Sequence, residues 1–400
     1  MHINAQQYNG QLNAPASKSH GQRLLLLSLI TSNPFEIQQL GSDNDSRAMQ
    51  AAVKSIKAQP NKEIFKTITV AESGFALRTL ALVGAGFYEH YLLSGSGTLL
   101  KRQHWATIKL LEQLGLEVRH QNGYLPLEVK GQITNTQLVI DGSEGSQYVS
   151  GLFFLAAKHP GTWQIEIQHL NSQPYFDLTL QTLELAGFTY QKKEDTYYFS
   201  GAQELKPNEA IVEGDWSSVA AHLVGAAIKG ELSVSGLNPD SLQPDKNLLI
   251  ALELFGANVR WENHQLIVTG SESKHSFEFD ITHQPDLFPV LVVLACAAKG
   301  TSSILGIHRL KNKESDRLKA MCDALTNWGV RFQINGDQID INGMGQVRSA
   351  HIDTQNDHRI VMAGCIASLL CSDGQQLAET SAIEKSYPKF IEDFLNLTKA

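Results

Sequence analysis

The sequence predicts a mixed α/β protein of two domains, assembled from one repeated supersecondary unit. Three observations carry this prediction: the chain length, a recurring helix–glycine–hairpin pattern, and a set of helices that are apolar on nearly every side. The chain has 400 residues, more than one ordinary hydrophobic core supports, so two domains are the starting expectation. Hydrophobic residues make up 42% of the sequence and charged residues 18%, which is typical of a globular protein.

An amphipathic helix that ends at glycine, followed by two strands and a polar turn between them, occurs four times. The stretches are LLEQLGLEVRHQNGYLPLEVKG, LELAGFTYQKKEDTYYFSG, LELFGANVRWENHQLIVTG and LTNWGVRFQINGDQIDINGMG. Their helix-ending glycines lie at intervals of 72, 69 and 73 residues: Gly115, Gly187, Gly256 and Gly329. Glycine suits this position because the residue after a helix often needs a positive φ. The alternation of polar and apolar residues in the strands predicts half-buried hairpins.

An apolar helix with a polar N-terminal head occurs six times. The stretches are SKSHGQRLLLLSLI, ESGFALRTLALVGAG, GSQYVSGLFFLAAKHPG, DWSSVAAHLVGAAIKG, QPDLFPVLVVLACAAKG and NDHRIVMAGCIASLL. Corresponding residues in their heads are Lys18, Gly74, Ser146, Trp216, Asp286 and Arg359. Helices without a polar face are buried. We therefore expect six units of roughly 70 residues, each with a buried helix, an amphipathic helix and about four strands, three units to a domain.

The heads of the buried helices are candidates for anion binding. A helix N-terminus offers unpaired N–H groups and a partial positive charge. Six such ends directed into one interdomain cleft would bind anions. Alternatively the heads are only N-caps, which we favour for DWSS (215–218) because Asp and Ser are preferred caps. Capping does not explain the added cations at or near the heads, which are Lys18, Arg23, Arg78 and Arg359.

Composition and short motifs limit the function classes. The net charge of −8 argues weakly against nucleic-acid binding, and no signal peptide or membrane-spanning run is evident, so we expect a cytoplasmic protein. The cysteines form no CxxC pair and are expected to be free thiols in a reducing compartment: Cys296, Cys322, Cys365 and Cys371. No Walker loop, GxGxxG, HExxH or GxSxG motif is present.

Charged residues concentrate in four short segments: QPD (284–286), RLKNKESDRL (309–318), NDHR (356–359) and EKSYPKF (384–390). Each segment also has a structural explanation on its own. Asp286 could be a cap, Ser315 or Asp316 could cap the following helix, and Lys385 could be a surface residue before a turn. Only their combination suggests a site.

These segments, in this order, resemble the 3-phosphoshikimate 1-carboxyvinyltransferase family, also called 5-enolpyruvylshikimate-3-phosphate (EPSP) synthases. The most specific matches are PASKSHGQR (15–23), DGSEGSQ, SQPYFDLTL, VEGDWSS, KESDRL, NDHR and EKSYPKF, and the resemblance covers nearly the whole chain. It implies an inside-out α/β barrel in two domains, with six β-α-β-α-β-β units. The implied domains are 1–11 with 214–400, and 12–213.

The resemblance implies transfer of the enolpyruvyl group of phosphoenolpyruvate to the 5-hydroxyl of 3-phosphoshikimate, with release of phosphate (EC 2.5.1.19). The implied contacts of 3-phosphoshikimate are Lys18, Ser19, Arg23, Ser146, Gln147, Ser172, Tyr175, Asp286 and Lys313. The implied contacts of phosphoenolpyruvate are Lys18, Gly74, Gln147, Arg317, Arg359 and Lys385. Both ligands are anions, which cations and N–H donors bind well.

Three residues are the expected catalytic groups. Asp286 is expected to be the base near the 5-hydroxyl, Glu314 to exchange a proton at C3 of phosphoenolpyruvate, and Lys18 to support proton transfer. A carboxylic acid that donates a proton needs a raised pKa, which burial and nearby anions supply. No metal or cofactor is expected, since the 14 histidines show no ligand spacing. The expected partners are the small anionic substrates, with no nucleic acid or membrane, and we expect a monomer.

The chain departs from the family pattern in its first half. Thr98 stands where the family usually has an arginine that grips the phosphate of phosphoenolpyruvate, and Glu72 and Phe75 replace Asn and Thr. Losing a charge-assisted contact would weaken binding about tenfold or more. Either Arg102 or Lys101 substitutes for the missing arginine, or the activity has become weak or altered.

Two other functions stay open. One is a diverged, low-activity or purely substrate-binding relic of the same fold. The other is the related enolpyruvyl transferase that acts on UDP-N-acetylglucosamine. Against the latter, position 19 is Ser rather than Asn, the loop 95–102 has no cysteine, and that enzyme lacks the KESDRL pattern.

Overall fold

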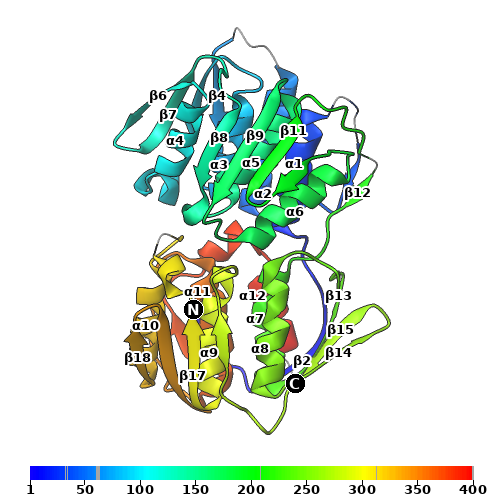
Figure 1. Cartoon of the computed structure of the whole chain (residues 1–400). Coiled ribbons are helices and arrows are strands. Elements are labelled where there is room, and N and C mark those ends of the chain that lie inside the picture. Colours follow the sequence, from blue (N-terminus) through cyan, green and yellow to red (C-terminus); the bar gives the residue numbers. More distant parts are fainter. Residues whose placement is uncertain (32, 34, 60–63, 208, 312, 399–400) are drawn as a thin grey trace. The chain divides into compact units, whose positions relative to one another are not determined.

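The computed structural model describes residues 1–31, 33, 35–59, 64–207, 209–311 and 313–398, and the chain forms two compact units (Figure 1). Unit 1 comprises Met1–Ser17 and Glu213–Ala400, and unit 2 comprises Lys18–Val212. The first division falls later than the boundary near residue 12 that we expected. The reason is that strand β2 (Tyr8–Asn13) pairs in parallel with β13 (Gly230–Ser235), which places it in a sheet of unit 1.

Four sheets share one strand order. In unit 2 the orders are β4-β5-β7-β6 and β8-β9-β11-β10; in unit 1 they are β2-β13-β15-β14 and β16-β17-β19-β18. Each first strand pairs in parallel with the second, and a hairpin completes the sheet. The remaining strands are β4 (Lys66–Thr69), β5 (His90–Ser94), β6 (Glu117–Gln121), β7 (Tyr124–Lys130), β8 (Gln137–Asp141), β9 (Thr162–Gln168), β10 (Gln191–Lys193), β11 (Thr196–Ser200), β14 (Asn258–Glu262), β15 (Gln265–Thr269), β16 (Glu278–Asp280), β17 (Lys299–Leu305), β18 (Arg331–Asn335) and β19 (Gln338–Met344).

The other two repeats have smaller sheets than the four strands we expected. In unit 1, β20 (His351–Ile352) pairs in parallel with β21 (Gln375–Leu377), which also pairs with β1 (His2–Ile3). In unit 2, β3 (Ile37–Gln38) pairs in parallel with β12 (Ala210–Ile211). These are the repeats where the chain enters and leaves a unit, so their strands come from distant parts of the sequence.

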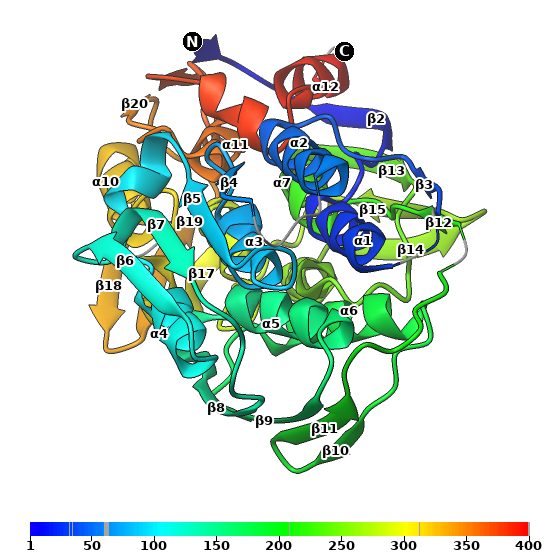
Figure 2. The same cartoon turned by 90° about the horizontal axis from the view of Figure 1, so that it is seen from above.

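The six apolar stretches form buried helices, as predicted. They are α1 (Lys18–Ile30), α3 (Gly74–Gly84), α5 (Gln147–Lys158), α7 (Trp216–Lys229), α9 (Phe288–Ala297) and α11 (His358–Ala367). Within unit 2, α1, α3 and α5 lie inside, with strands around them (Figure 2). Each unit has its own hydrophobic core. The sequence prediction of a mixed α/β fold with two domains is confirmed.

The amphipathic helices have between 8 and 15 residues. They are α2 (Asn44–Ala58), α4 (Trp105–Gln113), α6 (Gln173–Glu184), α8 (Leu248–Phe255), α10 (Arg317–Trp328) and α12 (Phe390–Leu397). The four repeated glycines all have positive φ, between 74° and 108°. Single 3₁₀ turns are η1 (Gly97–Lys101), η2 (Gly142–Glu144), η3 (Pro244–Asn247), η4 (Pro285–Leu287), η5 (Ile307–Leu310), η6 (Ser368–Leu370) and η7 (Ser381–Lys385).

Two further expectations can be compared with the structure. The Asp215 side chain accepts a hydrogen bond from Ser218 N at 2.7 Å, so the capping interpretation of DWSS is confirmed. All four cysteines are free thiols. None of the helices described here combines the length and the apolar character needed to cross a membrane.

Candidate active site

Arg23 links three helices of unit 2 at their N-terminal ends. From α1 its guanidinium donates to the Tyr175 carbonyl at 2.6 Å and to Thr179 Oγ1 at 2.9 Å, both on α6. It also lies over the ring of Phe75 on α3, 4.8 Å from the centroid. Arg23 is 1% exposed, and burial lowers its pKa to about 9. No carboxylate of a described residue lies at ion-pair distance from it, and a buried charge of this kind favours an anionic ligand.

A second cation connects α3 with α5. Arg78 Nη1 donates to Gln147 Oε1 at 2.7 Å, and Gln147 is the first residue of α5. The preceding residue, Ser146, is buried at the N-cap position. A Cβ on Gly74 would lie 3.0 Å from Arg78 Nη1, so glycine keeps this space open. Arg78 and Gln147 thus join the helix heads of two consecutive repeats.

The predicted residues at the head of α1 lie in the same part of unit 2. Lys18 Nζ donates to Asp45 Oδ2 at 3.0 Å, which connects α1 with α2. The Ser19 carbonyl accepts from Arg23 Nη1 at 2.9 Å. Ser172 is buried at the N-cap position of α6 with a φ of 59°, and Tyr175 follows in the first turn. The unit 2 residues that we predicted therefore gather at the N-terminal ends of α1, α3, α5 and α6.

Arg317 is the centre of the charged cluster in unit 1. Its side chain is completely buried at the start of α10. It donates to three carboxylates, at 2.6, 2.7 and 2.9 Å respectively: Asp286, Glu314 and Asp357. These belong to η4, to the KESDRL segment and to the N-cap of α11. Burial lowers the pKa of Arg317, but the three carboxylates outweigh it and raise that pKa well above its usual value.

Asp286 is surrounded by cations. In addition to Arg317, Lys313 Nζ lies 4.0 Å and Arg359 Nη2 lies 3.8 Å from its carboxylate. Burial raises the pKa of Asp286, but these three cations lower it more, so the net shift is strongly downward. Burial lowers the pKa of Lys313 to about 8, with Asp286 opposing the shift. The geometry keeps Asp286 ionised, as a base must be.

Arg359 connects two buried helices of unit 1. Its guanidinium, from the first turn of α11, donates to the carbonyl and the hydroxyl of Ser217 in the first turn of α7. The remaining predicted residue, Lys385, is half-buried at the end of η7, and η7 packs against α11. Of the predicted residues in unit 1, Asp286, Arg317 and Arg359 thus also lie at helix heads, whereas Lys385 lies at the end of η7.

Glu314, the expected proton donor, pairs with Arg317. Its carboxylate is 2.7 Å from Arg317 Nη2, at the start of α10. This contact places Glu314 in the charged cluster around Arg317.

Sequence reasoning did not assign roles to four residues that organise these clusters: Asp45, Arg78, Ser217 and Asp357. Arg78 had a visible signal, a cation in a helix head. The others did not, because Asp and Ser before or within a first helical turn are ordinary caps. Asp357 does cap α11, accepting from Arg359 N at 2.9 Å, and its second role with Arg317 is invisible in the sequence.

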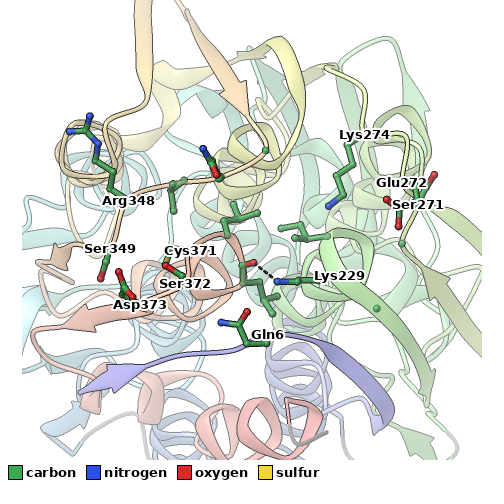
Figure 3. A pocket seen from close by; sticks show the side chains of 18 residues that line it. Gln6, Lys229, Ser271, Glu272, Lys274, Arg348, Ser349, Cys371, Ser372 and Asp373 are labelled. Atoms are coloured by element: carbon green, nitrogen blue, oxygen red, sulfur yellow. Dashed lines mark hydrogen bonds between the residues drawn. The ribbon is translucent and has the colours of Figure 1, made fainter.

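A separate pocket of about 940 Å³ lies in unit 1, near the C-terminal end of α7 and beside η6, which follows α11 (Figure 3). Its lining includes Lys229, the last residue of α7, together with Lys274, Arg348 and Cys371. None of the site residues predicted from the sequence lines it.

The fold and the two clusters define a class of enzymes that are built from repeated α/β units and bind small, highly charged anions. The profile of the family described as EPSP synthase (3-phosphoshikimate 1-carboxyvinyltransferase) matches residues 4–394. The chain therefore belongs to the EPSP synthase family, and the resemblance inferred from its motifs is confirmed.

Individual relatives agree with this assignment. The 3-phosphoshikimate 1-carboxyvinyltransferase of Thermococcus kodakarensis is 33% identical, over 97% of each chain. That of Pyrococcus furiosus is 32% identical, over 98% of this chain and 97% of the relative. Among solved structures, EPSP synthase from Acinetobacter baumannii has a TM-score of 0.82 at 20% identity, covering 99% of this chain and 97% of its own. The enolpyruvyl transferase NikO from Streptomyces tendae has a TM-score of 0.75 at 15% identity, covering 99% and 96%. These two structures show the shared fold.

Proposed function

We propose that the chain transfers the enolpyruvyl group of phosphoenolpyruvate to the 5-hydroxyl of 3-phosphoshikimate and releases phosphate. The observation that carries this proposal is the unit 1 cluster, in which Asp286 lies among the cations Lys313, Arg317 and Arg359. A base held among cations suits attack by a hydroxyl on a substrate with a phosphate and a carboxylate. The names of the relatives support the same reaction.

Each unit contributes part of the binding residues in this proposal. In unit 2, Arg23 takes the carboxylate of 3-phosphoshikimate, with contacts from Lys18, Ser19, Ser146, Gln147, Ser172 and Tyr175. In unit 1, Lys313 and Asp286 contact the same substrate, and Arg317, Arg359 and Lys385 bind phosphoenolpyruvate together with Lys18, Gly74 and Gln147.

The chemistry is addition followed by elimination. Asp286 accepts the proton of the 5-hydroxyl while the hydroxyl oxygen bonds to C2 of phosphoenolpyruvate. In the same step C3 of phosphoenolpyruvate gains a proton. The C2–O bond to phosphate then breaks, C3 loses a proton, and the double bond forms again. Glu314 is the group that gives and takes the C3 proton, and Lys18 supports proton transfer to the departing phosphate.

Anionic substrates would also activate the two carboxylates. In the structure, Arg317 donates to both Asp286 and Glu314. Burial raises the pKa of Asp286, but Arg317 and the other cations lower it more, which makes that carboxylate a weak base. A substrate phosphate or carboxylate that binds Arg317 competes with them for its N–H groups. Both carboxylates then hold a proton more readily, so proton transfer begins only when the substrate is bound.

Phosphate release on mixing the purified protein with both substrates tests the proposed function. Release should require phosphoenolpyruvate and 3-phosphoshikimate together, and Asp286→Asn should reduce it by about 10²–10⁴-fold. Binding of 3-phosphoshikimate without release would indicate a substrate-binding relic. Release only with UDP-N-acetylglucosamine would indicate the related transferase. The cytoplasmic location and the monomeric state stay predictions.

The pH dependence of kcat/KM for 3-phosphoshikimate should reveal Lys313. Its pKa of about 8 means that the cation is present below pH 8 and is lost above it, so kcat/KM should fall above that pH. In Lys313→Arg the side chain stays charged, so this fall should disappear. An unchanged profile in that variant would remove Lys313 from the proposed contacts.

A further inference from the structure

The segment where this chain departs from the family pattern forms a hydrogen-bonded relay in unit 2. Thr98, in η1, donates from its backbone N and its Oγ1 to Glu72 Oε2 at 3.3 and 3.4 Å. The same hydroxyl accepts from Arg102 Nη2 at 3.2 Å. A threonine hydroxyl has one hydrogen to donate and lone pairs to accept with, so both bonds can exist together. The relay Glu72–Thr98–Arg102 therefore fixes the direction of the Arg102 guanidinium.

The backbone around Glu72 is shaped to hold this relay. Gly97 has a φ of 54°, and a Cβ there would lie 2.1 Å from the Glu72 carboxyl group. Only glycine leaves room for the carboxylate at this point and adopts this backbone conformation easily. The missing side chain at Gly97 therefore helps to fix the position of the Glu72 carboxylate.

Arg102 and Arg78 both lie close to Gly74. From the point where a Cβ of Gly74 would lie, Arg78 Nη1 is 3.0 Å away and Arg102 Nη1 is 4.0 Å away. Lys101, the other candidate substitute, is exposed, whereas Arg102 is half-buried. Two guanidinium groups therefore lie beside the head of α3, where the helix N-terminus adds partial positive charge.

The pKa of His104 reflects the positive charge of the same two arginines. It is 2% exposed, and its Nδ1 has no hydrogen-bond partner among the described residues. Burial first, and then the charges of Arg78 and Arg102, lower its pKa to about 4, although a bond with the Leu99 carbonyl opposes the shift. His104 is therefore neutral near pH 7. The carboxylate of Glu72 is in hydrogen-bond contact with Thr98, which in turn contacts Arg102.

We propose that Arg102, held by Thr98 and Glu72, binds the phosphate of phosphoenolpyruvate in the space beside Gly74 together with Arg78. This inference rests on the proposed function and deepens it. Arg102 replaces the arginine that the family usually has at position 98. Glu72 is a positioning residue, because its carboxylate accepts hydrogen bonds from Thr98, which in turn accepts one from Arg102. A dianionic phosphate fits between two guanidinium groups, each of which can donate two parallel hydrogen bonds.

Steady-state kinetics of Arg102→Met test the proposal directly. The KM for phosphoenolpyruvate should rise about 10- to 100-fold, while the KM for 3-phosphoshikimate changes less than about twofold. Lys101→Met removes the neighbouring cation and should leave both values unchanged. Equal effects of the two variants on the KM for phosphoenolpyruvate would overturn the proposal.

The positioning role has its own pair of variants. Thr98→Val removes the hydroxyl and should raise the KM for phosphoenolpyruvate several-fold, whereas Thr98→Ser keeps the hydroxyl and should restore it. A purely structural role for Thr98 would affect thermal stability and both KM values alike. If Thr98→Val shows wild-type kinetics, the relay does not position Arg102.

Calorimetric titration of phosphoenolpyruvate into the protein with 3-phosphoshikimate separates this inference from the proposed function, since binding needs no turnover. If the wild type binds phosphoenolpyruvate more tightly than Arg102→Met but releases no phosphate, the inference holds and the proposed function fails. If the wild type releases phosphate and Arg102→Met binds phosphoenolpyruvate equally well, the inference fails alone. If the wild type does not bind phosphoenolpyruvate, both fail.

Discussion

Lys18→Met is expected to leave the protein folded and to lower kcat by about 10²–10⁴-fold. Lys18 is the first residue of α1, and its ammonium group lies 3.0 Å from Asp45. In the proposed mechanism it contacts both substrates and supports proton transfer to phosphate, so its charge matters most in the transition state. The lost bond to Asp45 should cost at most about 3 kcal/mol, less than the stability of a typical domain. Phosphate release and thermal unfolding of the same preparation measure the two effects.

Lys57→Met is the matched control for this prediction. Lys57 lies in the last turn of α2, on the helix that also carries Asp45, and donates to Ser28 Oγ at 3.2 Å. This variant removes the same charge from the same unit, away from the helix heads, and should keep nearly full activity. A fully active Lys18→Met protein would reduce PASKSHGQR to an ordinary charged helix end.

The repeated architecture could be predicted because each repeat carries a local signal. A glycine such as Gly115 or Gly329 marks a helix end by its positive φ, and a helix without a polar face must be buried. The four complete sheets with one strand order follow from these units. Local signals of this kind do not depend on the partner strand or helix.

The boundary near residue 12 could not be located from the sequence, because it depends on pairing across more than 200 residues. The β2 strand pairs with β13 through residues such as Leu12 and Val234. Nothing local distinguishes a strand that stays in unit 1 from one that starts unit 2. The small sheet of β3 and β12 has the same cause.

The motifs indicate which residues the charged cluster of unit 1 contains, but not how their charges pair. The motifs indicated Asp286, Glu314 and Arg317, but not that Arg317 binds both carboxylates. A motif records which residues are present and not how they pair.

Arg317→Met is expected to destabilise unit 1 by about 3–5 kcal/mol, in addition to abolishing most activity. The Arg317 side chain is fully buried, and so is that of Asp357, which it binds at 2.9 Å. Without the guanidinium, Asp357 remains as a buried and poorly compensated charge. For a domain of this size the loss corresponds to a fall in Tm of about 6–20 °C, measurable by circular dichroism.

A double variant separates stability from catalysis. Asp357→Asn in the Arg317→Met background removes the uncompensated charge and keeps an N-cap of good propensity for α11, so much of the lost Tm should return. Activity should not return, since the Arg317 guanidinium is still missing and can neither bind phosphoenolpyruvate nor release Asp286 and Glu314. Arg260→Met is the surface control: its ion pair with Glu262, at 2.8 Å, is partly exposed and should contribute about 1 kcal/mol or less. If Arg317→Met lowers Tm no more than Arg260→Met does, the three carboxylates do not depend on Arg317, and the coupling between substrate binding and proton transfer loses its structural basis.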